Sequence, residues 1–165
     1  MKSIHWKINN DYIGTIIKKN KYNKKLLLNN LSKYDCITQM DVCIDNNNNY
    51  WPQLIDYEQL YQENKDAIFI LNKRNPNKIL QSFKNWNKLL ERFYKYNPEL
   101  LEDKTDQGFI NFVNNHYNNV ENFFNTHSDS KFISYDIDKD DISKLNIYIN
   151  TYNLIFPHIN KNYKN

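Results

Sequence analysis

The sequence predicts an α/β protein in which a mostly parallel sheet has helices on both faces, a three-layer arrangement. Three observations support this fold class. Residues 67–71 form a continuous apolar run of the strand type, residues 131–137 alternate apolar and polar side chains, and segments with apolar residues every three or four positions surround both. We expect the order helix, strand, helix, strand, two helices, strand, helix.

The first half of the chain is expected to contain a helix, a strand and a second helix. Residues 11–28 mix apolar positions with lysine-rich stretches, which favours a short amphipathic helix followed by a basic turn. A short apolar segment at 34–38 predicts a strand, and the asparagine tract at 46–49 indicates an exposed loop. Trp51 and Pro52 then begin a helix that ends near Asn64.

The clearest helical periodicity follows the apolar run. Apolar residues at steps of three and four predict one long helix from Pro76 to about Tyr96, and the same pattern predicts another helix over residues 109–123. A last helix is expected to carry Ile142, Leu145, Ile149 and Tyr152. Acidic residues at 138–141 precede it, and negative charge is favourable at a helix start.

Composition limits the class of protein. The 165 residues predict one domain, and the 22 basic and 19 acidic residues are interspersed, which gives no strong nucleic-acid signal. Cys36 and Cys43 lack a second Cys or His pair at zinc spacing, so we expect free thiols and no metal. A membrane span needs about 18 consecutive apolar residues, and no apolar stretch of the sequence is that long. No signal-peptide core is present. These features predict a soluble, intracellular protein of the cytoplasm.

The abundance of Asn, Lys, Ile and Tyr, with only 2 glycines, is typical of AT-rich coding sequence. We therefore expect a source such as a large DNA virus or a protist, and single asparagines carry little functional weight. For a viral source, the expected location becomes the host cytoplasm or the virion.

Arg74 is the most informative candidate for a binding residue. It follows the predicted strand at 67–71, and Asn75 and Pro76 have the residue types of a helix cap and first helical position. Ligands of open α/β sheets bind outside the carboxyl ends of strands, where a guanidinium can hold a phosphate through two hydrogen bonds. Ser82 lies roughly 9 Å further along the helix, within reach of the same anion. The alternative is an arginine that merely ends a strand in solvent.

An arginine with a serine eight positions later, after a strand, resembles the 3'-phosphate-binding segment of PAPS-dependent sulfotransferases. Residues 60–67, 116–120 and 156–160 are also similar to segments of that superfamily, in the same order. The resemblance implies a P-loop NTPase-like fold, PAPS or 3',5'-ADP as cosubstrate, and sulfuryl transfer to a hydroxyl of a small molecule or glycan. It also implies that Arg74 and Ser82 bind the 3'-phosphate.

The chain departs from this family at its start. Relatives begin with a strand and a Gly/Lys/Thr/Ser-rich loop that binds the 5'-phosphosulfate, whereas Gly14 and Gly108 are not flanked by the required Lys and Ser/Thr. The resemblance therefore implies an N-terminally truncated fold without a central strand, which leaves two unpaired sheet edges. Residues 156–160 also lack the Arg-Lys-Gly element of many relatives. We expect millimolar or unmeasurable PAPS binding.

The base for sulfuryl transfer is predicted to be Asp41, because it follows the strand at 34–38 where relatives often place an acidic residue. A shift of two residues in the alignment puts Gln39 there instead, and a solvated loop aspartate is the other alternative. His116 lies on an apolar helix stripe, which favours a structural role. Lys73 is interpreted as a surface charge.

Two rival interpretations stay open. One is a non-catalytic sulfotransferase remnant that acts as an interaction or structural protein. The other is an RNA-associating module, suggested only by the lysines at 18–25. The expected partners are the hydroxylated acceptor and, because a strand is missing, a separate N-terminal fragment or a second copy of the chain. Neither a membrane nor a specific nucleic acid is expected as a partner.

Overall fold

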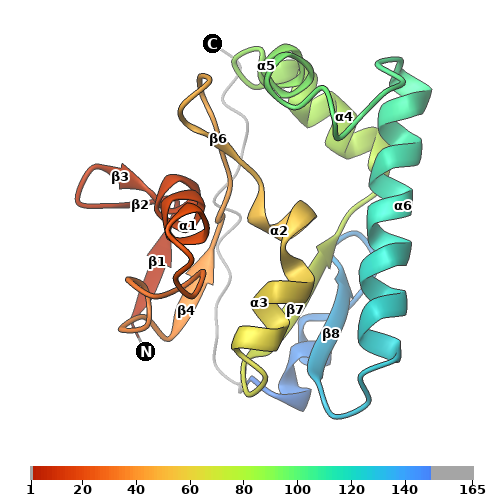
Figure 1. Ribbon diagram of the computed structural model, residues 1–165. Coiled ribbons are helices and arrows are strands. Elements are labelled where there is room, and N and C mark those ends of the chain that lie inside the picture. The colour runs from red at the N-terminus through yellow and green to blue at the C-terminus, as the bar shows by residue number, and fades with distance from the viewer. Residues whose placement is uncertain (1, 150–165) are drawn as a thin grey trace.

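The computed structural model describes residues 2–149, which form a mixed α/β fold (Figure 1). In chain order the elements are β1 (Ser3–His5), β2 (Lys7–Ile8), β3 (Asp11–Tyr12), α1 (Ile13–Tyr22), β4 (Cys36–Thr38), β5 (Val42–Cys43), β6 (Asn49–Tyr50), α2 (Pro52–Ile55), α3 (Tyr57–Glu63), β7 (Ile68–Lys73), α4 (Pro76–Asn85), α5 (Leu89–Tyr96), α6 (Asp106–Asn125), β8 (Lys131–Asp136) and the 3-10 helix η1 (Ile142–Ile147).

The strands of the described part form pairs. β1 and β4 are parallel over three residues, from Ser3 opposite Cys36 to His5 opposite Thr38. β7 and β8 are parallel over six residues, and β2–β3 and β5–β6 are short antiparallel hairpins. The predicted α/β class is therefore confirmed. In place of one continuous sheet, residues 2–149 contain two-stranded sheets only.

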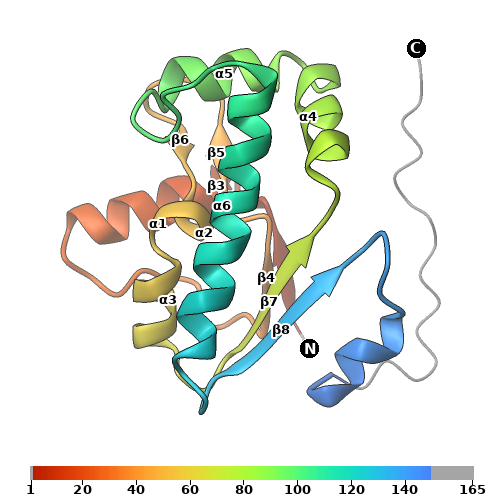
Figure 2. The same cartoon turned by 90° about the vertical axis from the view of Figure 1, so that its right-hand side faces the viewer.

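The helices that pack on the parallel strands share one side of them. Figure 2 shows α1, α3 and α6 on one side of β7 and β8, and η1 on the other. The described residues thus supply a full helical layer on one face, where the sequence predicted helical layers on both. Crossover segments still connect the parallel strands, as parallel pairing requires.

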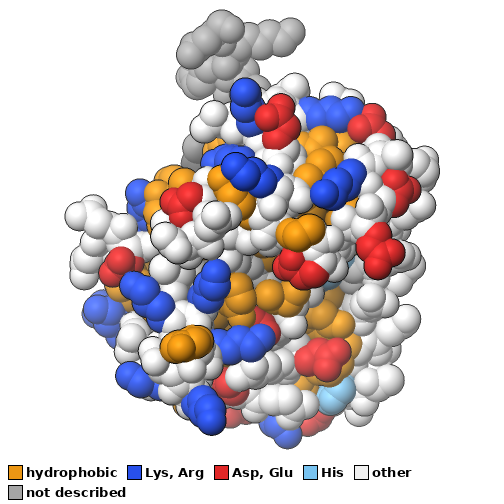
Figure 3. Space-filling view, turned by 45° about the horizontal axis from the view of Figure 1, so that its top comes forward, with side chains coloured by type: hydrophobic (Ala, Val, Ile, Leu, Met, Phe, Trp, Pro, Cys, Tyr) orange, Lys and Arg blue, Asp and Glu red, His pale blue; other side chains and the backbone are white. Residues whose placement is uncertain are grey.

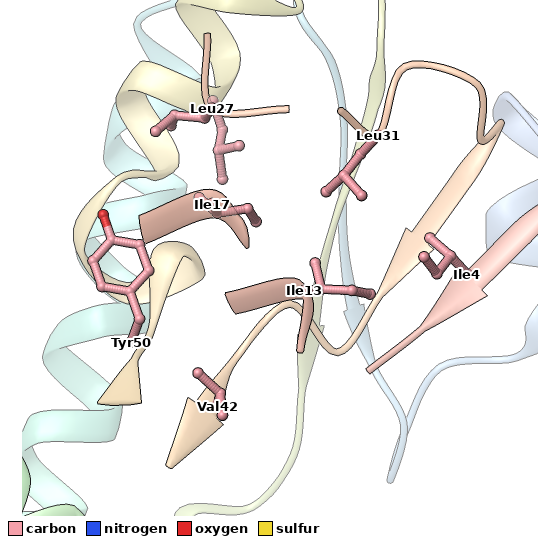
Figure 4. Close-up of a cluster of buried hydrophobic side chains, with 8 residues drawn as sticks. Ile4, Ile13, Ile17, Leu27, Leu31, Val42 and Tyr50 are labelled. Atoms are coloured by element: carbon pink, nitrogen blue, oxygen red, sulfur yellow. The ribbon is translucent and has the colours of Figure 1, made fainter. Parts of the chain in front are cut away.

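Three hydrophobic clusters hold these elements together. The first lies between α1 and the β1–β4 pair, where Ile13 and Ile17 are fully buried one helical turn apart and contact Ile4 of β1 (Figure 4). The second joins α4, α5 and α6, and its aromatic centre is Phe93. The third packs Tyr61 of α3 and two residues of α6 against β7 and β8.

A buried carboxylate fastens α1 to the middle of the chain. Asp56 is 4% exposed and accepts hydrogen bonds from the Lys21 ammonium and the Tyr50 hydroxyl. Burial, and then the hydrogen bond and charge of Asp56, raise the pKa of Tyr50. Because both partners satisfy it, Asp56 acts as a structural group.

The predicted single helix over residues 76–96 is wrong. α4 ends at Asn85 and α5 begins at Leu89, because Asn87 and Lys88 adopt positive φ angles of 39° and 54°. The turn folds α5 back so that Phe93 packs against Phe83, with ring centroids 5.9 Å apart.

Two further helices differ from their predicted form. The last expected helix forms a six-residue 3-10 helix, η1, which Asp141 caps by accepting the Ser143 N–H at 2.9 Å. Its predicted residue Tyr152, and the segment 156–160, lie outside the described residues. The helix expected over 52–64 is divided at Asp56 into α2 and α3.

We predict that Phe93→Ala lowers the free energy of unfolding by about 3–5 kcal/mol, because it removes the ring that contacts Trp51, Phe83 and Phe109. The matched control is Trp86→Ala. Trp86 is an aromatic residue of the same predicted helix but is 63% exposed, so its loss should cost much less. Urea denaturation of both variants measures this, and equal losses would contradict the packing described.

A second prediction concerns acid stability. His116 of α6 packs edge-on against Tyr57, and burial lowers its pKa below 6.5. The unfolded chain then binds a proton at a higher pH than the folded one. The contribution of His116 to stability is therefore present above about pH 6.5 and is lost as the pH falls through the folded pKa.

His116→Gln should remove that part of the pH dependence. Urea denaturation of the wild type and the variant at several pH values between 7.5 and 5 compares the two slopes. Identical slopes would show that His116 is not the group responsible.

Candidate functional site

A cleft of about 390 Å³ opens at the carboxyl ends of β7 and β8, beside the start of α4 and the flank of α6. This is the position that the sequence predicted for a ligand, outside the carboxyl ends of parallel strands. Its lining is strongly polar, with four cations and three carboxylates. The cations are Lys73, Arg74, Lys78 and Lys139, and the carboxylates are Glu121, Asp136 and Asp138.

Within residues 2–149, one of the four cations of the cleft has no carboxylate partner. Three lysines each form a salt bridge to one of the three carboxylates. The pairs are Lys73–Glu121 at 2.5 Å, Lys78–Asp138 at 2.7 Å and Lys139–Asp136 at 3.3 Å. Within residues 2–149 the Arg74 guanidinium forms neither a salt bridge nor a hydrogen bond, so the cleft has capacity for one further negative charge.

Arg74 is held in place through its backbone. The Tyr117 hydroxyl of α6 lies 3.1 Å from the Arg74 amide N–H, which donates to it, and 3.3 Å from the Arg74 carbonyl, to which it can donate. The side chain of Arg74 is exposed. A fixed backbone with a free guanidinium suits a residue that contacts an exchangeable anion.

The start of α4 already holds an anion that belongs to the protein. Asn75 caps the helix by accepting the Asn77 N–H at 2.9 Å, and Pro76 is the first helical residue, both as predicted. Asp138 then accepts hydrogen bonds from the Asn75 N–H at 3.0 Å and from the Lys78 ammonium at 2.7 Å. These bonds, from Lys78 first and Asn75 second, lower the pKa of Asp138, and the charge of Arg74 also contributes.

Lys73 has a structural partner, contrary to its interpretation as a surface charge. Its ammonium and the Ser134 hydroxyl both donate to Oε1 of Glu121, each at 2.5 Å. Burial raises the pKa of Glu121, but the two hydrogen bonds and the Lys73 charge outweigh it and leave the pKa below its ordinary value. The pair ties the end of β7 to α6.

Ser82 does not line the cleft that Arg74 lines. It is half-buried on α4, four residues after Lys78, which places it one helical turn, about 6 Å, further along the same side. A single phosphate could contact both Arg74 and Ser82 only if it lay between the Arg74 guanidinium and α4. The structure thus places the two predicted phosphate ligands apart, with Arg74 before the start of α4 and Ser82 in its second turn, and not around one point.

Asp41 lies in a second location, after the carboxyl end of β4. It is half-buried and accepts a hydrogen bond from the Gln53 amide at 3.0 Å. Burial raises the pKa of Asp41 against the opposing effects of hydrogen bonds and the nearby charge of His5. A raised pKa suits a general base, but Asp41 does not line the cleft of Arg74.

Both glycines serve close backbone packing. A Cβ at Gly14 would lie 2.8 Å from the Met40 carbonyl oxygen, so glycine lets α1 approach the segment beside Asp41. A Cβ at Gly108 would lie 2.0 Å from the Asp103 carbonyl oxygen, where the Gly108 N–H donates to the capping Thr105. Neither glycine therefore belongs to a phosphate-binding loop.

Sequence reasoning missed Asp138, Tyr117 and Glu121 as members of the site. The acidic run at 138–141 was assigned to the helix that follows it, and only Asp141 has that role. A carboxylate 63 residues away from Asn75 gives no local signal that it will cap the same helix start.

Across residues 2–149 no group of three His, Cys, Asp or Glu side chains is arranged to hold a metal ion. None of the helices in that range has both the length and the apolar character of a membrane span. Figure 3 shows Lys and Arg side chains interspersed with Asp and Glu on the face it presents, with no large patch of one sign.

Comparison of the chain with protein-family models, curated proteins and solved structures finds no match. The resemblance to sulfotransferases therefore rests on the segments of the sequence itself and stays a prediction.

We predict that Asp138→Asn strengthens anion binding in the cleft. The change removes the internal carboxylate that competes for the Asn75 N–H and Lys78, and it leaves Arg74 and Lys78 as two uncompensated cations. Affinity for inorganic sulfate should rise by about tenfold, which corresponds to roughly 1.4 kcal/mol. Chemical-shift titration with sulfate at constant ionic strength measures it.

Asp106→Asn is the matched control, because it removes the same charge from a salt bridge outside the cleft, to Lys84. Equal affinities of the two variants would show that Asp138 does not compete with bound anions.

Proposed function

We propose that this chain is a sulfotransferase-like protein whose cleft at Arg74 binds the 3'-phosphate of PAPS or 3',5'-ADP. The observation that carries the proposal is that, among residues 2–149, the Arg74 guanidinium forms no salt bridge in a cleft whose other charges are paired. It also stands at the carboxyl end of a parallel strand and next to a helix start, two features that favour anions. The three-layer P-loop-like fold belongs to the same proposal.

In the proposed sulfuryl transfer, each candidate residue would have a separate role. The Arg74 guanidinium would hold two phosphate oxygens, and Ser82, one turn beyond Lys78, would donate to the nucleotide further along α4. Asp41, with its raised pKa, would take the proton of the acceptor hydroxyl as the acceptor oxygen bonds to the sulfur of PAPS and the bond from sulfur to the phosphate oxygen breaks, which releases 3',5'-ADP. The acceptor would be a hydroxylated small molecule or glycan in an intracellular compartment.

The expected affinity for the nucleotide is low. A charge-assisted hydrogen bond contributes about 1.5–3 kcal/mol, whereas micromolar binding needs about 8 kcal/mol. The phosphate must also displace Asp138 from the start of α4 if it is to use the Asn75 N–H and Lys78. Millimolar binding by residues 1–165 is therefore the expectation.

The second candidate function is a non-catalytic protein that acts through interactions. The observation that favours it is Asp138, which occupies the start of α4 as an internal anion. In such a protein the cleft would be a structural joint between β8, α4 and α6, and sulfuryl transfer would be absent. Of the five lysines at 18–25, Lys18 donates to the Asn49 carbonyl and Lys21 to Asp56, so the RNA-associating alternative depends on the other three.

We predict that Arg74→Ala abolishes binding of 3',5'-ADP by this chain. Chemical-shift titration at up to several millimolar 3',5'-ADP suits the expected weak affinity, and isothermal titration would detect any tighter binding. The wild type should show saturable shifts at the amides of α4 and of residues 73–75. Lys84→Ala, on the same helix but outside the cleft, is the control and should bind like the wild type.

Two outcomes would decide against the proposal. Absence of any saturable shift in both the wild type and Asp138→Asn would favour the non-catalytic function. Undiminished binding by Arg74→Ala would place the nucleotide elsewhere.

A further inference from the structure

The two parallel strand pairs lie next to each other without being joined. In Figures 1 and 4, β4 is on the side of β1 that faces β7. β4 forms ladder hydrogen bonds to β1 alone and β7 to β8 alone, so among residues 2–149 no strand is paired with the facing edges of β4 and β7. All four strands run in the same direction in Figure 1.

Such an arrangement is unusual for parallel strands. All-parallel sheets occur almost only where helices cover both faces, and an isolated pair of strands such as a hairpin is marginally stable at best. An edge also presents a row of unpaired N–H and C=O groups, which is a template for another strand. Here two such rows, of the same direction, face each other.

The side chains around these edges are apolar on the helical side. Ile37 of β4 and Phe69 of β7 both pack against the cluster that contains Ile4, Ile13 and Ile17. Phe69 also packs against the third cluster, beside Tyr61 and Phe124. The interval between β4 and β7 is therefore bounded by apolar groups that continue from one cluster into the next.

We propose that a strand from a separate polypeptide segment adds between β4 and β7 and hydrogen-bonds to both in parallel. The occupant is an extended segment of about five or six residues, matched to the length of β7, with apolar side chains at alternate positions toward the helices. This proposal goes beyond the function proposed above and does not depend on nucleotide binding.

A second folded copy of the chain does not meet these requirements. A two-fold symmetric dimer joined at the same edge pairs that edge with itself, which makes the two strands antiparallel and satisfies only one edge per chain. One strand that is parallel to both β4 and β7 must come from a segment that is not already paired in a sheet. The geometry thus selects an extended peptide segment.

The position of the added strand connects it with both candidate residues. Its carboxyl end would emerge between the ends of β4 and β7, hence between Asp41 and Arg74. In open α/β sheets the loops at these ends form the ligand crevice. The segment that follows the added strand would therefore enter the interval between the two residues, which the described chain keeps in separate locations.

The test uses a synthetic peptide and leaves the protein unchanged. The probe is a capped peptide of six residues, alternately isoleucine and threonine, between terminal lysines, and it is added to the chain without nucleotide. Hydrogen exchange of the backbone amides is followed in residues 36–38 and 68–73. We expect slower exchange in both segments.

Two control peptides make the test specific. In a parallel strand, alternate residues direct their N–H groups to opposite neighbours, so N-methylation of the odd or of the even amides blocks one edge each. Both methylated peptides should bind at least tenfold more weakly than the parent peptide. Circular dichroism of the chain with each peptide checks that the protein stays folded.

Several results would overturn the proposal. They are no protection, protection of only one segment, undiminished binding by either methylated peptide, or self-association of the chain alone that protects both segments. Because nucleotide is absent, these results are independent of the test of Arg74.

Discussion

The parallel pairing of β7 with β8 against α6 is the constraint on which the other features of this structure depend. Parallel neighbours need a long crossover, and here it comprises α4, α5 and α6. Phe124 of α6 packs on this pair of strands. Its ring stacks on that of Phe132 of β8, with ring centroids 4.3 Å apart, and also contacts the ring of Phe69 of β7. Because both strands end at the same side, the start of α4, the end of β8 and the flank of α6 surround one cleft.

Electrostatics then decide what that cleft can do. Its lysines neutralise carboxylates from α6, from β8 and from the segment after β8, and Asp138 occupies the place at the start of α4 that the proposed function would give to a ligand phosphate. Within residues 2–149, Arg74 is the cation of the cleft that has no salt bridge. The arrangement is compatible with the weak nucleotide binding proposed above and, if the internal carboxylate is not displaced, with a purely structural role. Whether the carboxylates of the cleft stay paired with its lysines, more than the number of charges, therefore distinguishes the proposed nucleotide binding from the proposed structural role.

The two main strands of the fold were predictable from the sequence, and the long helices were predictable only in part. Residues 67–71 and 131–137 were predictable as strands because a run or an alternation of apolar residues is a local pattern, although Ile68 and Ile70 of β7 are 39% and 42% exposed within the described residues. The long helix over 76–96 was wrong because its periodicity continues smoothly through Trp86, while the turn at Asn87 and Lys88 is set by packing of Phe93 against Phe83. The two-residue strands, such as β2 and β5, carry too few residues for a pattern.

The sequence by itself determined how α4 begins: Asn75 caps it, Pro76 starts it and Arg74 precedes it, because these features depend only on neighbouring residues. The tertiary structure alone decided that Asp138 reaches that helix start, that Ser82 lies one turn away from the cleft, and that the facing edges of β4 and β7 have no partner strand within residues 2–149. These three features join segments that are distant in the chain, and hydrogen bonds and packing between distant segments exist only once the backbone has folded.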